Sequence, residues 1–398
     1  MQALYRQQGA QMDITILAED EVQQFIDTHA EALNGSFSQV KMSDTMRQRL
    51  ERSNWVFSGM KTFHELNESF PSLLDENGDR KPFERFLNDV RAVDETYNGN
   101  YLRAEYNFIH ASASMAAKWE QYQEDGDRYY LQYRTAGDDR VRPEHAALEG
   151  VTLPMDDPFW EEYYPPNGWN CRCTVVQVRK SKYPKTDHDE AMRLGELATG
   201  QDTRGMFHFN PGKQQKAVPD YNPYTIRQCR QCPTAKGDGK ENLAAFIPQN
   251  DLCQACQTVR SIHDKKDREN IMDEKKRRLD RFVTFETESK NLQTGKFYQT
   301  KSAYKRGIAH AYNIEELNMY EWIPRNLDKL EFIRFSPLGE VKDMTSEKDI
   351  KNIENKRKRH VTGYNVYKLI DGDTEWQVKM EIYRDKNETV YHVMKKRR

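Results

Sequence analysis

The sequence has no long hydrophobic run. No apolar stretch approaches the ~18 residues that a membrane-spanning helix needs, and the first residues lack the apolar core of a secretory signal. Hydrophobic residues make up only 37% of the chain, which argues against an integral membrane protein, while the 11% of aromatic residues can fill several small cores. We therefore expect no membrane contact and, for 398 residues, two or three folded domains.

Cysteine is also scarce. The six cysteines form three close pairs: Cys171 and Cys173, Cys229 and Cys232, and Cys253 and Cys256. Six are too few for a disulfide scaffold in a chain of this length, and paired spacing without a secretory signal is typical of metal binding. The sequence contains no internal repeat.

The net charge of -2 hides an uneven distribution. Residues 257–398 contain 32 Lys and Arg against 24 Asp and Glu, a net charge of +8. Residues 1–256 contain 29 against 39, a net charge of -10. An acidic body with a basic end predicts contact with nucleic acid, RNA or DNA, at the C-terminal part.

The hydrophobic pattern predicts an α+β protein with several domains. A stripe at helical spacing indicates a long helix over residues 100–123: Leu102, Tyr106, Ile109, Ala113 and Ala116. Residues 17–125 are predicted mostly helical, and residues 129–134 and 173–178 are predicted strands. Further predicted strands cover residues 330–336, 363–370, 375–384 and 389–394, with Asp371-Gly372 as a hairpin turn.

We divide the chain into five parts on this pattern. Residues 1–180 form a helical and β-containing domain, and residues 181–225, rich in proline, form a loose connector. A cysteine module covers residues 226–260, a charged helical linker covers 261–284, and a small basic α+β domain covers 285–398.

Two Cys-x-x-Cys pairs separated by 20 residues indicate a zinc module. Its expected ligands are Cys229, Cys232, Cys253 and Cys256. Four thiolates complete a closed tetrahedron without an open position, so such a zinc ion is structural. The alternatives are two redox dithiols or reduced surface cysteines.

A second possible metal site lies upstream. Asp139, His145, Cys171 and Cys173 can all ligate a metal, and a hairpin-like return would bring them together. A zinc ion there would pin a loop that has little apolar material to hold it. The alternative is a set of hydrogen-bonded loop residues without a metal, because the single residue between Cys171 and Cys173 is a tighter spacing than the usual zinc knuckle.

The residues around this second site carry a family resemblance. The stretch contains Asp138-Asp139-Arg140 followed by His145, then Leu148-Glu149-Gly150, and it ends with Pro165-Pro166-Asn167-Gly168-Trp169-Asn170-Cys171-Arg172-Cys173. This pattern closely resembles the phage Mu F-like minor head proteins, also called phage head morphogenesis proteins, over about residues 50–180. The resemblance implies a virion protein near the portal, made in the bacterial cytoplasm, whose partners are portal and capsid proteins.

The C-terminal part contains a strand that alternates between two faces. Trp376, Val378, Met380 and Ile382 are expected to face a core, and Gln377, Lys379, Glu381 and Tyr383 to face outward. Phe332, Arg334 and Ser336 are expected to share one face of another strand. A sheet face with acidic, basic and histidine side chains is suited to metal-independent RNA cleavage, in which a base, an acid and phosphate-holding cations cooperate.

Residues 285–398 resemble the phage-encoded barnase–EndoU–colicin–RelE-like nuclease domains that occur behind F-like head domains in polymorphic toxins. The matching features are Ile308-Ala309-His310-Ala311, the strand at 332–336, the basic run at 356–360, and the strand at 376–381 followed by Tyr391-His392. The resemblance implies His310, His360 and His392 as acid or base candidates and Glu381 as the preferred base. Arg334 and Lys379 would hold the phosphate.

These features lead to one principal hypothesis and two alternatives. The chain is expected to be a phage or prophage minor head protein with structural zinc and a C-terminal ribonuclease-like domain. Alternatively, the basic domain binds packaged nucleic acid or another head protein and cuts nothing. In the third interpretation, nucleic-acid binding by the cysteine module is the main function.

Overall fold

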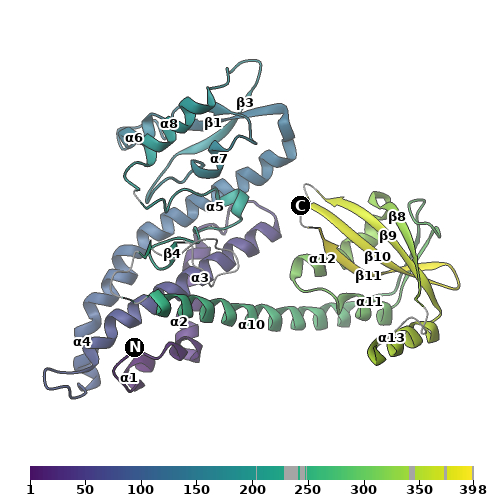
Figure 1. Ribbon diagram of the computed structural model, residues 1–398, viewed down its shortest axis with the longest axis horizontal. Helices are drawn as coiled ribbons and strands as arrows, with labels where there is room; N and C mark the ends of the chain where they lie inside the picture. Colours follow the sequence, from purple (N-terminus) through teal and green to yellow (C-terminus); the bar gives the residue numbers. More distant parts are fainter. Residues whose placement is uncertain are drawn as a thin grey trace. The chain divides into compact units, whose positions relative to one another are not determined.

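The chain folds into two compact units, Met1–His263 and Asp264–Arg398, which are described separately below (Figure 1). The computed structural model describes residues 1–202, 204–227, 241–242, 247, 249–339, 346–371 and 374–396. In this part of the chain, none of the helices has both the length and the apolar character that crossing a bilayer requires.

The first unit is mainly helical. Its longer helices are α2 (Asp20–Gly35), α3 (Asp44–Ser69), α4 (Phe83–Asp94), α5 (Leu102–Asp125), α8 (His188–Thr199) and the N-terminal part of α10 (Gln249–Arg281). Its shorter helices are α1 (Gln2–Arg6), α6 (Pro143–Ala146), α7 (Phe159–Glu162) and α9 (Pro211–Gln214). The mostly helical character predicted for residues 17–125 is confirmed.

One hydrophobic core joins α2, α3, α4, α5 and the start of α10. Helices α3 and α10 approach closely at Gly59, where an added Cβ would lie 2.6 Å from Cγ1 of Val259. The predicted helix over 100–123 is confirmed as α5 with its ends shifted by two residues, and Ile109, Ala113 and Ala116 of the stripe are buried. The stripe is therefore a packing surface, as its spacing predicts.

A small antiparallel sheet lies beside the C-terminal half of α5 (Figure 1). Its order is β2 (Thr152–Leu153), β1 (Tyr129–Arg134) and β3 (Thr174–Arg179). The two predicted strands are thus confirmed and pair with each other, with Tyr133 opposite Val175. A two-stranded pair, β4 (Ile226–Arg227) and β5 (Glu241–Asn242), also belongs to this unit.

Residues 181–225 differ from the loose connector that their proline content predicts. Helix α8 packs so closely that a Cβ added at Gly195 would lie 2.4 Å from Cδ2 of Tyr163. Helix α9 packs against α5, where a Cβ at Gly212 would lie 2.2 Å from Cβ of Trp119. The prolines interrupt secondary structure in this segment, but they do not prevent it from being buried.

The second unit is built on a six-stranded sheet of order β6-β7-β11-β10-β9-β8. The strands are β6 (Phe285–Glu288), β7 (Lys296–Gln299), β8 (Glu331–Pro337), β9 (Val361–Asp371), β10 (Thr374–Tyr383) and β11 (Asn387–Lys395). All neighbours are antiparallel except β7 and β11. Asp371 pairs with Thr374, which confirms the predicted hairpin, although the turn residues Gly372 and Asp373 lie outside the described range.

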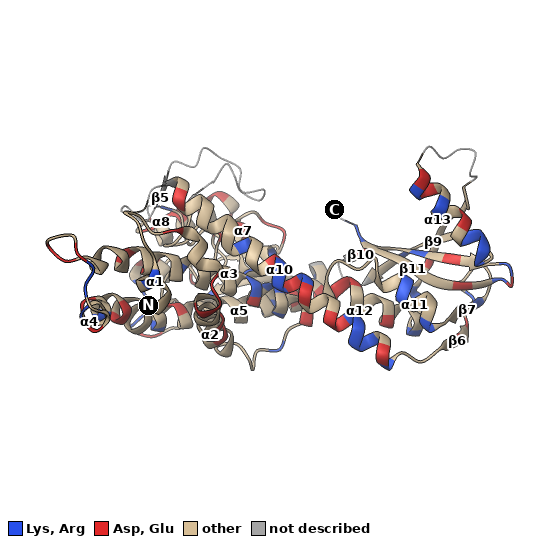
Figure 2. Ribbon diagram, turned by 90° about the horizontal axis from the view of Figure 1, so that it is seen from below, with Lys and Arg blue, Asp and Glu red and all other residues tan. Residues whose placement is uncertain are grey.

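Besides the C-terminal part of α10, the described residues of the second unit form the α-helices α11 (Lys301–Ile308), α12 (Ile314–Trp322) and α13 (Glu347–Lys358) (Figure 2). Helices α11 and α12 pack on the face of the sheet that carries Trp376, Val378 and Met380, as the alternation of that strand predicts. Gly307 allows α11 to approach β11, since an added Cβ would lie 2.9 Å from the carbonyl oxygen of Val390. This approach brings the end of α11 to the site described below.

Candidate functional site

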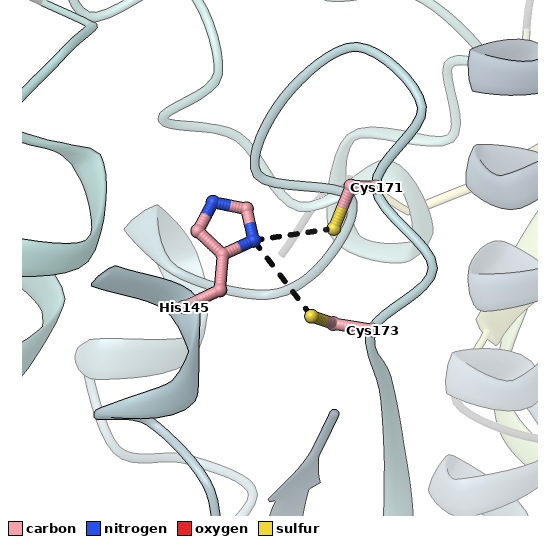
Figure 3. A group of neighbouring side chains, drawn as sticks. All are labelled: His145, Cys171 and Cys173. Carbon is pink, nitrogen blue, oxygen red and sulfur yellow. Dashed lines mark hydrogen bonds between the residues drawn. The ribbon is translucent and has the colours of Figure 1, made fainter. Parts of the chain in front are cut away.

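Three potential metal ligands meet in the first unit (Figure 3). His145 comes from α6, Cys171 from the loop before β3, and Cys173 directly precedes β3. The Nδ1 atom of His145 lies 3.8 Å from the Sγ atom of each cysteine, and the three ligand atoms all lie within 4.8 Å of one another. All three side chains are at least 92% buried, so the group is shielded from bulk water.

The spacing of the two cysteines directs both thiols inward. Arg172, between them, points the other way and donates two hydrogen bonds of 2.6 Å to the carboxylate of Asp138. This pair holds the pKa of Asp138 at about 2, chiefly through the hydrogen bonds from Arg172. Alternation along an extended chain explains how a single intervening residue allows both thiols to face His145.

The two thiols differ in their readiness to lose a proton. A hydrogen bond from Cys173 lowers the pKa of the Cys171 thiol well below its ordinary value. The same contact, together with burial, raises the pKa of Cys173. One thiolate is therefore favoured in the pair before any cation arrives, and a bound cation would favour the second.

The group fits a zinc ion in donor chemistry and size. Thiolate sulfur and imidazole nitrogen are the ligands that zinc prefers. A tetrahedral ion with Zn–S of about 2.3 Å and Zn–N of about 2.0–2.1 Å implies an S–N separation of roughly 3.6 Å. The observed 3.8 Å is close to this value.

Asp139, the fourth residue of the predicted upstream site, is not part of the group among the described residues. It lies exposed on the turn before α6, and its neighbour Asp138 accepts hydrogen bonds from Arg172.

The four-cysteine module stays a prediction, because Cys229 and Cys232 lie outside the described residues. Cys253 and Cys256 lie one turn apart on α10 and pack against the helical core.

A second group of polar residues lies on the sheet of the second unit. Strand pairing places Arg334, Lys379 and His392 in one row across β8, β9, β10 and β11, with Val366 between the first two. The next row on the same face contains Ser336, Tyr364 and Glu381. We call this surface the polar sheet face.

One face assignment made from the sequence is wrong. The register shifts between Phe332 and Arg334, so Phe332 pairs with Tyr367 and Arg334 with Val366, which lie on opposite faces. Phe332 therefore points away from Arg334 and contacts the ring of Tyr367 at 5.8 Å between centroids. A β-bulge reverses the alternation by one residue, and no sequence signal marks it here.

Two helices add cations to the polar sheet face. From the end of α11, the ring of His310 lies 4.7 Å from the ring of Tyr391 and 5.1 Å from that of His392, between centroids. From the end of α13, the Nζ atom of Lys356 lies 5.1 Å from the ring centroid of Tyr364 and 5.0 Å from that of Tyr391.

The carboxylate of Glu381 lies among these side chains and is 1% exposed. Its Oε2 atom accepts hydrogen bonds from Arg359 at 3.3 Å and from the hydroxyl of Tyr383 at 2.9 Å. Arg306 lies 3.8 Å from the same oxygen. The other oxygen, Oε1, is buried without a hydrogen-bond partner among the described residues. The predicted outward orientation of Glu381 is thus correct, but arginines and a tyrosine cover it.

The pKa values of the basic side chains on the polar sheet face are lowered chiefly by burial and further by neighbouring positive charge. Burial lowers the pKa of His310, and the ammonium of Lys356 lowers it further. Burial and the neighbouring His310 lower the pKa of His392. Burial also lowers the pKa of Lys356 and of Lys379. A nearby negative charge would raise these pKa values again.

The structure brings together five of the six residues predicted for catalysis: His310, Arg334, Lys379, Glu381 and His392. The sixth, His360, lies exposed on the turn between α13 and β9, with a φ of 62°. The sequence analysis did not propose the following members of the group as site residues: Arg306, Lys356, Arg359, Tyr364, Tyr383 and Tyr391. The available signals were the basic run at 356–360, the outward position of Tyr383 beside Glu381, and the position of Tyr391 next to His392.

Comparison with known proteins concerns the first unit. Residues 77–176 match the family model described as "Phage Mu protein F like protein". The chain is 30% identical over 168 residues to "Putative capsid assembly protein F" of Escherichia phage Mu, which covers 42% of this chain and 31% of that protein. It is 36% identical over 100 residues to "Mu-like prophage FluMu F protein" of Haemophilus influenzae, covering 23% and 24% of the two chains.

The chain thus spans between a quarter and a third of the length of these two relatives. No solved structure matches the chain. The matched stretch includes β1, α6 and the loop that leads into β3, and it contains all three members of the buried ligand group. Residues 77–176, with His145, Cys171 and Cys173, therefore carry a domain similar to phage Mu protein F.

Proposed function

We propose that this chain is a phage or prophage head-assembly protein that becomes part of the virion, close to the portal or the inner capsid surface. The observation that carries the proposal is the similarity of residues 77–176 to Mu F proteins, one of which is named a capsid assembly protein. Its partners would be portal and capsid proteins. The acidic first unit would dock on them, and the basic second unit would be carried inside the head.

The buried ligand group supports a structural zinc ion in this domain. His145, Cys171 and Cys173 would hold the ion, which would join α6 to the start of β3 across a stretch with little regular structure. Zinc supplies no redox chemistry, so its contribution there is to fix the loop. Asp139 and the four-cysteine module remain further ligand candidates.

Two measurements test this part of the proposal. Zinc content of the purified full-length chain should be reduced when Cys171 and Cys173 are changed to serine, with C253S and C256S measured in parallel to detect the separate cysteine module. A phage or prophage lacking the gene should fail to form infectious particles, and the wild-type gene should restore them. Normal particles without the gene would contradict the assembly function.

A second function, RNA cleavage, is favoured by the polar sheet face. In this proposal His310 and His392 would act as the acid–base pair, and Arg334 and Lys379 would hold the phosphate. A base would remove the proton of a 2′-hydroxyl, and that oxygen would form a bond to phosphorus. As the bond to the 5′ oxygen breaks, the acid would protonate that oxygen, leaving a 2′,3′-cyclic phosphate and a free 5′-hydroxyl.

The role of Glu381 in this scheme follows from its contacts. The Oε2 atom already accepts from Arg359 and Tyr383, and Oε1 has no hydrogen-bond partner among the described residues but is buried, so a substrate hydroxyl would reach Oε1 only after the covering side chains move. Glu381 remains the alternative base through that oxygen, and its contacts also hold the arginines in place.

The test is incubation of the full-length protein with RNA and with DNA in the presence of EDTA. Cleavage of RNA that persists in EDTA and disappears in H310A and H392A would support the enzyme. Salt-dependent binding without cleavage would instead support the structural alternative, a domain that holds packaged nucleic acid or another head protein. Loss of DNA affinity on deletion of residues 226–260 alone would indicate that the cysteine module is the binding part.

A further inference from the structure

The buried group of His145, Cys171 and Cys173 provides three ligands, whereas a tetrahedral zinc ion takes four. Closed structural sites obtain all four from the protein, and sites with three protein ligands leave one position for an external group. Among the described residues, Asp139 is outside the group and no other His, Cys, Asp or Glu belongs to it, so these residues leave one position of the ion to be filled.

A cavity of about 320 Å³ adjoins the group. The three ligands line one part of it, so a ligand in this space can reach the metal position. The remaining lining comes from the turn before α6 and the loop before β3: Ala136, Arg140, Val141, Arg142, Asn170 and Arg172. The lining thus includes three arginines and no carboxylate-bearing residue.

The arginines are partly engaged already. Arg172 is paired with Asp138, and the Nη2 atom of Arg142 donates to the carbonyl oxygen of Trp169 at 2.6 Å. Arg140 lies 3.6 Å from Asp138 with 78% of its side chain exposed. These contacts fix the base of the cavity. Because each guanidinium group carries five N–H donors, some of them remain available to a ligand.

We propose that this cavity binds a phosphate group as the fourth ligand of the metal centre. The inference rests on the zinc site proposed above. Two thiolates cancel the charge of the zinc ion, and Asp138 offsets only one of the three arginines, so the cavity wall keeps a net positive charge that favours an anion over water. Guanidinium groups hydrogen-bond phosphate oxygens in pairs, which distinguishes phosphate from a simple halide ion.

The proposal assigns the three arginines a ligand-binding role. Arg140, the most exposed, closes over the ligand from the cavity mouth, and Arg142 contacts it from the side of α6. The phosphate comes either from free inorganic phosphate or from a nucleic-acid backbone, and the two sources offer the same oxygens to the metal.

The test uses the full-length chain loaded with cobalt(II) in place of zinc, because cobalt reports its ligands through visible absorption bands. We expect added inorganic phosphate to shift these bands in a saturable way. R140Q and R142Q should each weaken this effect by about tenfold, with unchanged cobalt content. The matched control is R193Q, an exposed arginine of α8 paired with Glu190, which should leave the titration unchanged.

A short single-stranded DNA without terminal phosphate forms the second arm. Bands that shift only with DNA assign the ligand to the nucleic-acid backbone, and bands that shift only with inorganic phosphate assign it to the free ion. Bands that respond to neither, or that change in D139A before phosphate is added, overturn the proposal, since water or Asp139 then completes the centre. Failure of the chain to bind cobalt at all would instead overturn the metal site itself.

Discussion

The imidazole rings of His310 and His392 face each other across the end of α11 and β11, with centroids 5.1 Å apart. The pKa of each is lowered, by burial first and then by neighbouring positive charge. Both rings are therefore expected to be largely neutral at pH 7, and the proposed cleavage, which needs one protonated ring, should be fastest below pH 6.5. H310A and H392A should each reduce kcat/KM by about 10²- to 10⁴-fold.

The pH profile gives a further check on this pair. In K356Q, the ammonium that lowers the pKa of His310 is removed, so the profile should move to higher pH. H360A is the informative comparison, because the sequence resemblance implies a catalytic role whereas the ring lies exposed on a turn. We expect H360A to keep activity within several-fold of wild type. A loss as large as that of H310A would restore His360 to the site.

Removal of the charge of Glu381 should destabilise the second unit. In E381Q, Arg359 and Arg306 lose the one carboxylate that both approach, at 3.3 and 3.8 Å. We expect the free energy of unfolding to fall by about 1–3 kcal/mol, less than for a fully buried pair because both arginines are partly exposed. The measurement is chemical denaturation, and a double-mutant cycle with R359Q should show coupling between the two residues.

Glu65 of α3 should make stability depend on pH in a predictable direction. Burial raises the pKa of its carboxyl from 4.5 to about 7, although Asn98 donates to both of its oxygens. The carboxyl of Glu65 therefore binds its proton more tightly in the folded state than in the unfolded chain. The bound proton stabilises the folded wild type, and this contribution to the free energy of unfolding is lost as pH rises through about 7.

The E65Q variant carries no titratable group at this position. Its stability relative to wild type should rise from about pH 4.5 and level off above about pH 7, at up to about 3 kcal/mol. Unfolding curves at several pH values measure the difference. E84Q, an exposed position on α4, is the control, and a flat difference for E65Q would contradict the prediction.

The packing of residues 181–225 can be tested with two glycines of one segment. G195A places a Cβ within 2.4 Å of the ring of Tyr163 and should lower stability by about 1–3 kcal/mol. G200A, at the end of the same helix, meets only backbone oxygens at 3.4 Å and should change stability little. Equal effects of the two substitutions in thermal unfolding would mean that α8 is not packed as described.

Metal removal should affect the first unit. A chelator should lower the unfolding temperature of the wild-type chain, because the ligands come from positions 26 and 28 residues apart and the ion joins them. C171S and C173S should reduce that sensitivity, and H145A should do the same. A full response to the chelator in all three variants would place the stabilising metal elsewhere, with the four-cysteine module as the first candidate.

Much of the local structure could be predicted from the sequence. The stripe that begins at Leu102 predicts α5, and the alternation around Val378 predicts both a strand and the face that packs on the helices. The ligand-capable residue types predicted a group of Asp139, His145, Cys171 and Cys173; the structure brings the last three together, and binding of an ion there stays a prediction. These signals are local, since each depends on residues within one element or on a compact motif.

The remaining features depend on contacts between distant segments. Arg306 and Arg359 reach Glu381 from two helices, and nothing in the strand that contains Glu381 indicates that they will cover it. The bulge before Arg334 depends on how β8 pairs with β9, and not on a residue type. The position of Asp139 likewise depends on the exposed turn before α6, where the distant Arg172 donates hydrogen bonds to the neighbouring Asp138.

The bulge in β8 has a consequence for solubility. Among the described strands β8 ends the sheet, and an edge strand offers backbone groups to which another chain can add. The register shift interrupts the regular ladder, the charge of Arg334 follows it, and Pro337 closes the strand without an N–H group. The same irregularity that aligns Arg334 with Lys379 thus also disfavours the addition of another strand at an edge that exposes Phe332, Ile333 and Phe335, so we expect a straight strand to lose both properties at once.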